Sequence, residues 1–408
     1  MNNSNIQPSN ALRPTPGVAI CIVVENLPVP FDRRIWQEAR ALREAGYGVS
    51  IICPKGKGFE SSHETLEGIE IYRHYIWEAS GLLGYLGEYA WALAAELFLA
   101  GRIYRKTQFR ILQAANPPDT IFLIGLVFKF FGVRFIFDHH DLNPELFEAK
   151  FKKHGLFYRM VCLAERWTFR TAAVSIATNE SYREIALARG GMDPEKVFVV
   201  RSLPDLNHVH RIPPRAELKM GKTYLIAFVG VMGFQDGLDL LLESVEYIVK
   251  KQNRRDSLFV MIGSGTEAPR LRALTAEKGL DEWVKFTGRI PEEELGAYLC
   301  TADVCVAPDP ANPMNDKSTM NKILQYMAFG MPVVLYDLTE GRRSAGDTAL
   351  YARPNDSVDF AAQILKLIDS EPLRRELGDR ARKRIEEKLD WNIEKKTLLA
   401  AYQAALIR

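Results

Sequence analysis

Cysteine is scarce in this chain, with five residues among 408, and none stands in a C-x-x-C pair. That spacing is typical of zinc sites and of redox-active disulfides, so the sequence favours neither kind of site. Cys21, Cys53 and Cys305 fall inside apolar, strand-like runs, whereas Cys162 and Cys300 do not. We expect the first three thiols to be small buried hydrophobic groups in a reducing compartment.

An excess of charge of one sign is also lacking. The 53 Lys and Arg residues nearly balance the 51 Asp and Glu residues, which gives a formal net charge of +2 and argues against a general nucleic-acid binder. Long uncharged apolar runs are missing too, since the most apolar window, residues 81–101, contains Glu88 and Glu96 and does not suit a membrane span. Residues 1–16 are polar without an apolar core, which predicts a disordered tail and not a signal peptide. These absences predict a cytoplasmic protein.

What the sequence does contain is an alternation of short β-branched runs with helical patterns, as expected of parallel βαβ units. The strands expected in the first half are 18–24, 49–53, 69–72, 111–114, 134–137, 174–178 and 197–200. The pattern restarts after Pro204, and the strands expected in the second half are 225–229, 258–262, 284–286, 304–307 and 333–335. The fold class is therefore α/β with two doubly wound, Rossmann-like domains.

The segment between the two series, residues 206–222, contains Pro213, Pro214 and several charges and is expected to be an exposed linker. The predicted domains are residues 17–205 and 223–390, followed by a last helix at 391–408. In such sheets the binding loops follow the carboxyl ends of the strands, so we expect them to face each other across a cleft.

Residues 309–346 read as a polar loop, a helix and a buried strand in succession. Ser318 or Thr319 can cap the helix, and Gly330 can end it. The N–H groups of a helix's first turn have no internal partners and lie at the positive end of its dipole. A phosphate is a natural ligand at that position. An ordinary strand-loop-helix unit without a ligand is the alternative.

The run from Lys322 to Val334, KILQYMAFGMPVV, resembles the donor-nucleotide signature of family-4 glycosyltransferases. In that signature two glutamates precede the small-residue stretch. Here Lys317 stands at the place of the first and Gln325 at the place of the second, with Asp316 as the nearest acid. The chain apart from its tail likewise resembles the GT-B fold, in which the last helix crosses back onto the first domain. A last helix that packs only on its own domain is the alternative.

The resemblance implies that the second domain binds a nucleotide-sugar donor. Relatives place an Arg and a Lys in the loop after the first strand of this domain, where this chain has Val231 and Asp236. The implied donor contacts are Gly233, Ser318, Thr319 and Lys322 for the diphosphate, Gly265 for the nucleotide, Arg289 and Ile290 for the base, Gln325 and Glu340 for the ribose, and Asp316 for sugar hydroxyls. Arg342 and Arg343 are further candidates to replace the missing cations, or else solvated surface charges.

In the first domain, His139, His140 and Asp141 end an expected strand, at the place where the resemblance implies a His or Asp beside the reacting sugar carbon. Neighbouring strand residues face opposite ways, so which histidine is turned toward the substrate stays open. We predict His140, Asp141 and Asp316 as catalytic residues. No D-x-D motif occurs, so we expect no metal and no other cofactor, the nucleotide-sugar being a substrate.

Arg33 and Arg34, at an expected helix start, suit a phosphorylated or acidic acceptor. A surface salt bridge to Glu38 is the alternative. The stretch from Lys150 to Arg159 mixes basic and apolar residues without an acid, as in segments that lie on the inner face of an anionic membrane. A helix that covers its own domain is the other interpretation of this stretch.

The resemblance therefore implies a retaining, metal-independent hexosyltransferase in cell-surface polysaccharide biosynthesis. It would transfer a sugar from a nucleotide-sugar donor, UDP-sugar being the expected one, to a glycan or lipid-linked glycan. A catalytically silent GT-B partner protein and a sugar-nucleotide epimerase are the alternatives.

Overall fold

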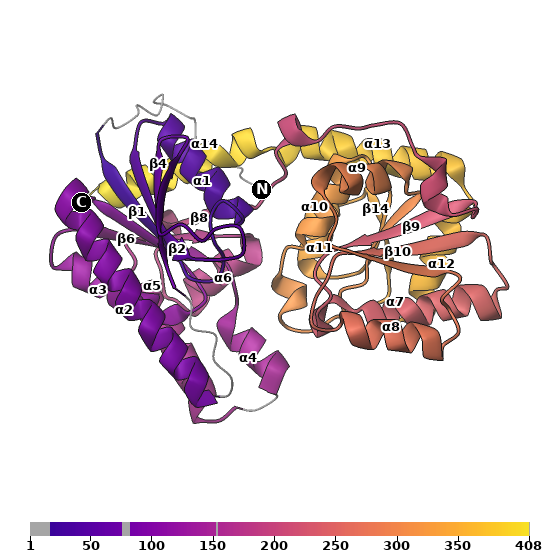
Figure 1. Cartoon of the computed structure of the whole chain (residues 1–408), viewed down its shortest axis with the longest axis horizontal. Coiled ribbons are helices and arrows are strands. Elements are labelled where there is room, and N and C mark those ends of the chain that lie inside the picture. The colour runs from indigo at the N-terminus through magenta and orange to yellow at the C-terminus, as the bar shows by residue number, and fades with distance from the viewer. Residues whose placement is uncertain (1–16, 76–81, 152–153, 408) are drawn as a thin grey trace, which may run out of the picture. The chain divides into compact units, whose positions relative to one another are not determined.

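The computed structural model describes residues 17–75, 82–151 and 154–407. The predicted tail, residues 1–16, lies outside the described part of the chain. Two compact units are formed, the first by residues up to Arg201 together with those from Glu394 on, and the second by Ser202–Ile393. Each unit contains one sheet with helices on both faces (Figure 1).

The first unit has an eight-stranded sheet with the order β3-β4-β2-β1-β5-β6-β7-β8. Its strands are β1 (Ala19–Val24), β2 (Gly48–Pro54), β3 (His63–Leu66), β4 (Ile69–His74), β5 (Ile111–Ala115), β6 (Arg134–His139), β7 (Val174–Ala177) and β8 (Val197–Val199). All pairs are parallel except β3 with β4. Its helices are α1 (Arg33–Glu44), α2 (Leu82–Thr107), α3 (Phe122–Lys129), α4 (Asn143–Phe151), α5 (Leu156–Thr171), α6 (Glu180–Ala188) and α14 (Trp391–Leu406), with 3-10 turns η1 (Asp119–Ile121) and η2 (Pro194–Lys196).

The second unit has a six-stranded parallel sheet with the order β11-β10-β9-β12-β13-β14. Its strands are β9 (Tyr224–Val229), β10 (Ser257–Ile262), β11 (Val284–Gly288), β12 (Val304–Ala307), β13 (Val333–Tyr336) and β14 (Ala349–Ala352). Its helices are α7 (Leu238–Glu246), α8 (Ala268–Glu277), α9 (Glu292–Thr301), α10 (Asn321–Ala328), α11 (Thr339–Ala345), α12 (Ser357–Ile368) and α13 (Glu371–Lys388). Shorter turns are η3 (Leu206–His208), η4 (Ala216–Lys219), η5 (Phe234–Asp236), the π-helical η6 (Tyr247–Lys251) and η7 (Asn315–Lys317).

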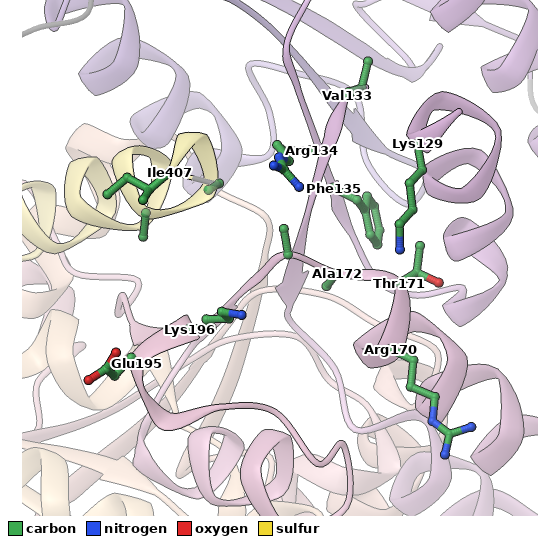
Figure 2. Close-up of a pocket in the computed structure, with 13 residues that line it drawn as sticks. Lys129, Val133, Arg134, Phe135, Arg170, Thr171, Ala172, Glu195, Lys196 and Ile407 are labelled. Carbon is green, nitrogen blue, oxygen red and sulfur yellow. The ribbon is translucent and has the colours of Figure 1, made fainter. Parts of the chain in front are cut away.

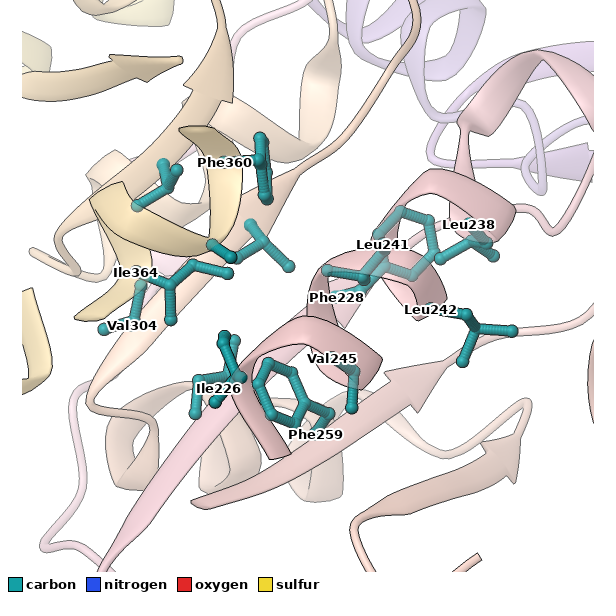
Figure 3. Packing of buried hydrophobic residues seen from close by; sticks show 14 of the residues in the cluster. Ile226, Phe228, Leu238, Leu241, Leu242, Val245, Phe259, Val304, Phe360 and Ile364 are labelled. Carbon is teal, nitrogen blue, oxygen red and sulfur yellow. The ribbon is translucent and has the colours of Figure 1, made fainter. Parts of the chain in front are cut away.

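Strand β9 shows why these apolar runs become central strands. Ile226 and Phe228 belong to the core on one face of the sheet, packed with α7 and α12 (Figure 3). Leu225 and Ala227 belong to the core on the other face, packed with α9 and α10. Because both faces of a parallel sheet are covered, successive residues are all apolar rather than alternating with polar ones.

The last helix returns to the first unit, as predicted. Tyr402 of α14 is fully buried, its ring lies 6.0 Å from that of Tyr47, and its hydroxyl donates a hydrogen bond to Oε1 of Gln113 on β5. The alternative, packing only on the preceding domain, is wrong.

The predicted linker is attached to the second unit along much of its length. The N–H of Arg215 donates to Oγ1 of Thr301 at 2.9 Å, and Nζ of Lys219 donates to Asp303 at 2.7 Å. The 3-10 turn η4 therefore anchors the segment that the composition predicts as an exposed connector.

Two of the strands in the structure, β3 and β14, were not predicted from the sequence.

Candidate active site

The loops after strands β9 and β10 in the second unit meet through their backbones. The N–H of Met232 donates to the carbonyl of Ser264 at 3.1 Å. Gly263 has φ +128°, and a Cβ there would collide with the carbonyl of Gly230, just as one at Gly265 would collide with the backbone of Met232. Glycine is required at both positions because the two backbones approach so closely. Without side chains, these turns present backbone peptide groups at the carboxyl edge of the sheet.

The Gly233 turn, predicted to bind diphosphate, is closed by Asp236. Oδ2 of Asp236 accepts a hydrogen bond from the N–H of Gly233 at 3.1 Å. Gly237 follows with φ +66°, and a Cβ there would collide with the carbonyl of Pro308. A carboxylate of the same loop thus holds the amide that a phosphate would use.

Lys322, the other predicted diphosphate ligand, lies between two carboxylates. Its Nζ is 2.7 Å from Oδ1 of Asp309 and 3.0 Å from Oδ1 of Asp236. It also lies 4.8 Å from the centre of the Phe228 ring, and its side chain is 9% exposed. Burial works against the charge, but the two carboxylates raise the pKa of Lys322 above its usual value. The group therefore holds one cation and two acids before any ligand arrives.

Asp309 is a buried acid to which the sequence analysis gave no role. Its Oδ1 accepts from Lys322, whereas its Oδ2 has no hydrogen-bond partner among the residues that the structure describes. Burial raises the pKa of Asp309, and Lys322 offsets this only in part. Its place two residues after β12, at the edge where binding loops gather, is the feature that could have indicated it.

Helix α10 begins at Asn321, and not directly after Ser318 or Thr319. Its N-cap residue is Met320, which makes no side-chain cap hydrogen bond. Ser318 Oγ instead donates to the carbonyl of Met314 at 2.8 Å, so this hydroxyl belongs to the preceding turn η7. The predicted capping is therefore wrong.

The residues predicted for the donor sugar and the ribose lie on three elements, Asp316 on η7, Gln325 on α10 and Glu340 on α11. Asp316 accepts from both the N–H and Oγ1 of Thr339, at 2.8 and 2.9 Å, and so holds the first residue of α11. Glu340 is buried and accepts from Nη1 of Arg343 at 2.6 Å. Gln325 lies half-buried on α10, and its side-chain amide makes no hydrogen bond to another described residue. Gln325 has the amide free for a ligand, whereas both acids are engaged within the protein.

Arg342, a candidate replacement cation, is also paired. It donates to both carboxylate oxygens of Asp337, at 2.7 and 2.6 Å, and lies 4.0 Å from the centre of the Tyr351 ring. Its side chain is 53% exposed, so the pair is a surface one.

Arg289 and Ile290 directly follow strand β11, next to the turn that contains Gly265. Nε of Arg289 donates to Oγ of Ser264 at 3.1 Å, and the N–H of Gly263 donates to the carbonyl of Gly288 at 2.9 Å. The backbone predicted to meet the base is thereby tied to the glycine turn after β10.

In the first unit the structure separates the two histidines. His139 is fully buried, and both of its ring nitrogens lack a hydrogen-bond partner among the described residues. Its ring packs against those of Phe137, Phe169 and Tyr182, and burial lowers its pKa to about 3. His140 is 17% exposed at the carboxyl edge of the sheet, so it is the histidine that a ligand can reach.

His140 is held by a buried acid that the sequence analysis did not single out, Asp138. Nε2 of His140 lies 2.8 Å from Oδ2 of Asp138 and also 2.8 Å from Nε of Arg34. Burial opposes protonation, but Asp138 outweighs it and raises the pKa of His140. Nε2 of His140 therefore has two roles. It donates to Asp138 when it carries a proton, and it can accept from Arg34 when it does not.

The guanidinium of Arg34 is bound by the acids of this network. Its Nη2 lies 2.9 Å from Asp138 and 3.0 Å from Glu38, and its side chain is 10% exposed. The alternative interpretation, a surface pair with Glu38, is confirmed for Arg34 as to the partner and wrong as to the location, because the pair is buried. Arg33, the first residue of α1, is exposed. Of the two predicted acceptor ligands, Arg33 is therefore the more accessible.

The network extends to the last helix. Nε2 of Gln113 donates to both Glu38 and Asp138 at 2.8 Å, and its Oε1 accepts from Tyr402. No local pattern links these residues, since Gln113 and Tyr402 are 289 positions apart.

Asp141, the third residue of the predicted catalytic group, is held through its backbone. Oδ1 of Asn116 accepts from the N–H groups of His140 and Asp141, at 2.7 and 3.1 Å, and Nδ2 of Asn116 donates to the Asp141 carbonyl at 2.7 Å. The carboxylate of Asp141 is exposed. The backbone is fixed while the acid stays accessible to a ligand.

Comparisons with known proteins agree with this architecture. A family described as "Glycosyl transferase 4-like domain" matches residues 32–202, and one described as "Glycosyl transferases group 1" matches residues 223–370. The 2-deoxystreptamine glucosyltransferase of Streptomyces kanamyceticus is 22% identical over 302 residues, covering 71% of this chain and 75% of that protein.

Among solved structures, Anabaena HepE in complex with UDP and glucose has a TM-score of 0.74 at 15% identity, with 95% of this chain and 100% of that one covered. A sucrose-phosphate synthase from Thermosynechococcus elongatus has a TM-score of 0.73 at 17% identity, with 95% and 99% covered. Two Rossmann-like units and a returning last helix make up the GT-B fold. The two family models together cover most of the chain, which therefore belongs to family 4 of the GT-B glycosyltransferases.

Proposed function

We propose that the chain is a retaining, metal-independent hexosyltransferase that transfers a sugar from UDP-sugar to a hydroxyl of a glycan or lipid-linked glycan. Cell-surface polysaccharide synthesis is the process to which such a product belongs.

The proposed binding of the sugar donor rests on the glycine turns after β9 and β10, which present backbone peptide groups at the carboxyl edge of the second unit's sheet. Gly263 and Gly265 leave room for backbone alone, and the turn that they form is tied to Arg289. Peptide N–H groups in such a turn can donate hydrogen bonds to the oxygens of a nucleotide at short range. A related fold, that of Anabaena HepE, was solved in complex with UDP-glucose.

In the proposed reaction the anomeric C–O bond to the diphosphate breaks on the face where the acceptor hydroxyl attacks. The acceptor proton passes to the departing diphosphate oxygen, so bonds and charges balance without a covalent enzyme intermediate. This chain's own residues would bind and orient the reactants and stabilise charge. His140 and Asp141 would contact the acceptor hydroxyl or the transferred sugar.

The diphosphate must compete with Asp309 and Asp236 for Lys322. A diphosphate brings more than one negative charge, and Asp309 has a pKa that burial already raises. We infer that Lys322 turns from Asp309 to the diphosphate and that Asp309 takes up a proton at the same time. Binding of the donor would then be linked to proton uptake.

The same cluster supports a second candidate, a catalytically silent partner protein. One lysine held by two acids is a poor binding site for an anion, because the carboxylates already neutralise it. Calorimetry with UDP, GDP and their sugars separates the two candidates: binding supports the transferase, and no binding at millimolar concentration supports the silent partner. Conversion of UDP-sugar without an acceptor would instead indicate an epimerase.

We further propose contact with the inner face of an anionic membrane. Lys152 and Lys153 of the predicted segment lie outside the described residues, but α5 continues it with an apolar stripe. Leu156, Met160, Leu163 and Trp167 recur at helical spacing and are 43% to 72% exposed. Among the described residues no helix is long and apolar enough to cross a bilayer.

Flotation with vesicles tests the membrane contact. Met160→Ser and Leu163→Ser together should reduce binding to vesicles that contain phosphatidylglycerol, because they remove the apolar part of the contact. The pair Val127→Ser and Val358→Ser, also exposed but off this stripe, is the control. Equal flotation of both double variants would contradict the proposal.

A further inference from the structure

The first unit contains a pocket of about 390 Å³ that is separate from the candidate active site. Arg134 and Phe135, at the beginning of β6, line it, whereas His140 follows the end of the same strand. Six residues of extended strand span roughly 20 Å. The pocket thus lies at the amino edge of the sheet, opposite the edge that carries the binding loops.

The lining is strongly basic. Lys129 at the end of α3, Arg134, Arg170 at the end of α5 and Lys196 before β8 contribute four basic side chains, against the single acid Glu195. Figure 2 shows the charged ends of Lys129, Arg134 and Lys196 around the middle of the pocket, while Arg170 and Glu195 extend away from it.

These three inward cations are unpaired. Within the described ranges, the side chains of Lys129, Arg134 and Lys196 have neither a hydrogen bond nor an ion pair. Arg170 differs, since its guanidinium lies 5.8 Å from the centre of the Trp167 ring. The positive charges of these side chains repel one another in the pocket unless a bound anion neutralises them.

Attraction to helix dipoles does not account for the whole group. Helices α3, α5 and α14 all end near this edge, and their last carbonyls favour cations. That explains the placement of Lys129 and Arg170 in last turns. It does not explain Arg134, which begins a strand, and none of the inward side chains donates to a backbone carbonyl.

We propose that this pocket binds a phosphate monoester. Two ammonium groups and one guanidinium can each take one of the three oxygens of a dianionic phosphate head, with the planar guanidinium able to grip two at once. The apolar walls, from Val133, Phe135 and Ala405, would receive the remainder of the molecule. A soluble ester and a lipid headgroup both present this phosphate head, and the experiment below distinguishes the two sources.

Calorimetry with glycerol phosphate and with inorganic phosphate tests the pocket. Arg134→Gln and Lys196→Gln should each weaken binding by about tenfold, the loss expected for one charge-assisted hydrogen bond. Arg105→Gln, which removes an exposed arginine of α2 that does not line the pocket, is the matched control and should change nothing. Melting temperatures of the three variants establish that each is folded.

The remaining outcomes assign the source or overturn the proposal. Soluble esters that bind and are lost in Arg134→Gln identify a soluble ligand. Failure of the soluble esters, together with flotation on phosphatidic acid vesicles that Arg134→Gln reduces and Arg105→Gln does not, identifies a headgroup. The proposal fails if neither probe responds to Arg134→Gln. UDP binding should be unchanged in both pocket variants, so this test is independent of the proposed transferase function.

Discussion

The ammonium of Lys322 lies 2.7 Å from the carboxylate of Asp309. This pair stands where the family signature leads one to expect a lysine that is free to bind a diphosphate. A second acid, Asp236, replaces the cation that relatives have in the neighbouring loop and lies 3.0 Å from the same ammonium. The loops that the resemblance assigns to the donor thus carry one lysine held by two acids.

Lys322→Ala should weaken UDP binding by at least about tenfold and leave uridine binding nearly unchanged, because only UDP carries the phosphates that the ammonium contacts. Calorimetry with the two ligands measures the difference. Lys317→Ala, which removes the lysine of the preceding turn η7, is the control. Equal losses for UDP and uridine would exclude a diphosphate role for Lys322.

Asp309→Asn should strengthen UDP binding by up to about tenfold, since it removes one of the two acids that compete for Lys322. The substitution should also abolish the proton uptake that we infer for donor binding, since Asn does not titrate. Calorimetry in buffers with different ionisation enthalpies measures both quantities. Weaker UDP binding by a folded Asp309→Asn variant would show that Lys322 needs Asp309 to hold it in place.

The sequence predicted the order of the elements well because central parallel strands are apolar on both faces. Strands β3 and β14 both escaped prediction. His63–Leu66 pairs at the antiparallel edge and is mostly polar, and Ala349–Ala352 contains no β-branched residue. Neither has the continuous β-branched character that marks the central strands.

Side-chain pairing could not be predicted in the same way. Asp236 is 86 positions from Lys322, and Gln113 is 289 positions from Tyr402. Such contacts are set by which loops and helices the sheet order brings together, and no local spacing encodes them. His140 and Lys322 could be singled out by position along the chain, but their partners emerge only from the fold.

Tyr402→Phe should lower the free energy of unfolding by about 1–3 kcal/mol, because it leaves Oε1 of the buried Gln113 without its donor. Tyr47→Phe is the matched control, since the hydroxyl of Tyr47 has no hydrogen-bond partner among the described residues. Urea denaturation of both variants provides the comparison.

The same substitution should alter the pH dependence of His140. Gln113 also donates to Asp138, and the charge of Asp138 raises the pKa of His140. A Gln113 side chain that is no longer held by Tyr402 would change its hydrogen bond to Asp138 and hence the electrostatic potential at the imidazole. NMR titration of His140 would detect the shift. An unchanged titration in Tyr402→Phe would confine the role of the last helix to stability.

Glu25→Gln should stabilise the protein at alkaline pH. Glu25 directly follows β1, and burial, together with the nearby Glu88, raises its pKa from 4.5 to about 8. Between these two values the folded state binds more protons than the unfolded state, so stability falls as the pH rises through this window. Gln has no proton to lose and avoids this penalty. At pH 8.5 the variant should therefore be more stable by at least about 1 kcal/mol, the free energy of one pKa unit, whereas near pH 4 the two proteins should be similar.

Glu67→Gln, at an exposed pair with Arg40, should show no such divergence. Parallel stability curves for wild type and Glu25→Gln from pH 4 to pH 9 would mean that Glu25 is ionised at its ordinary pKa.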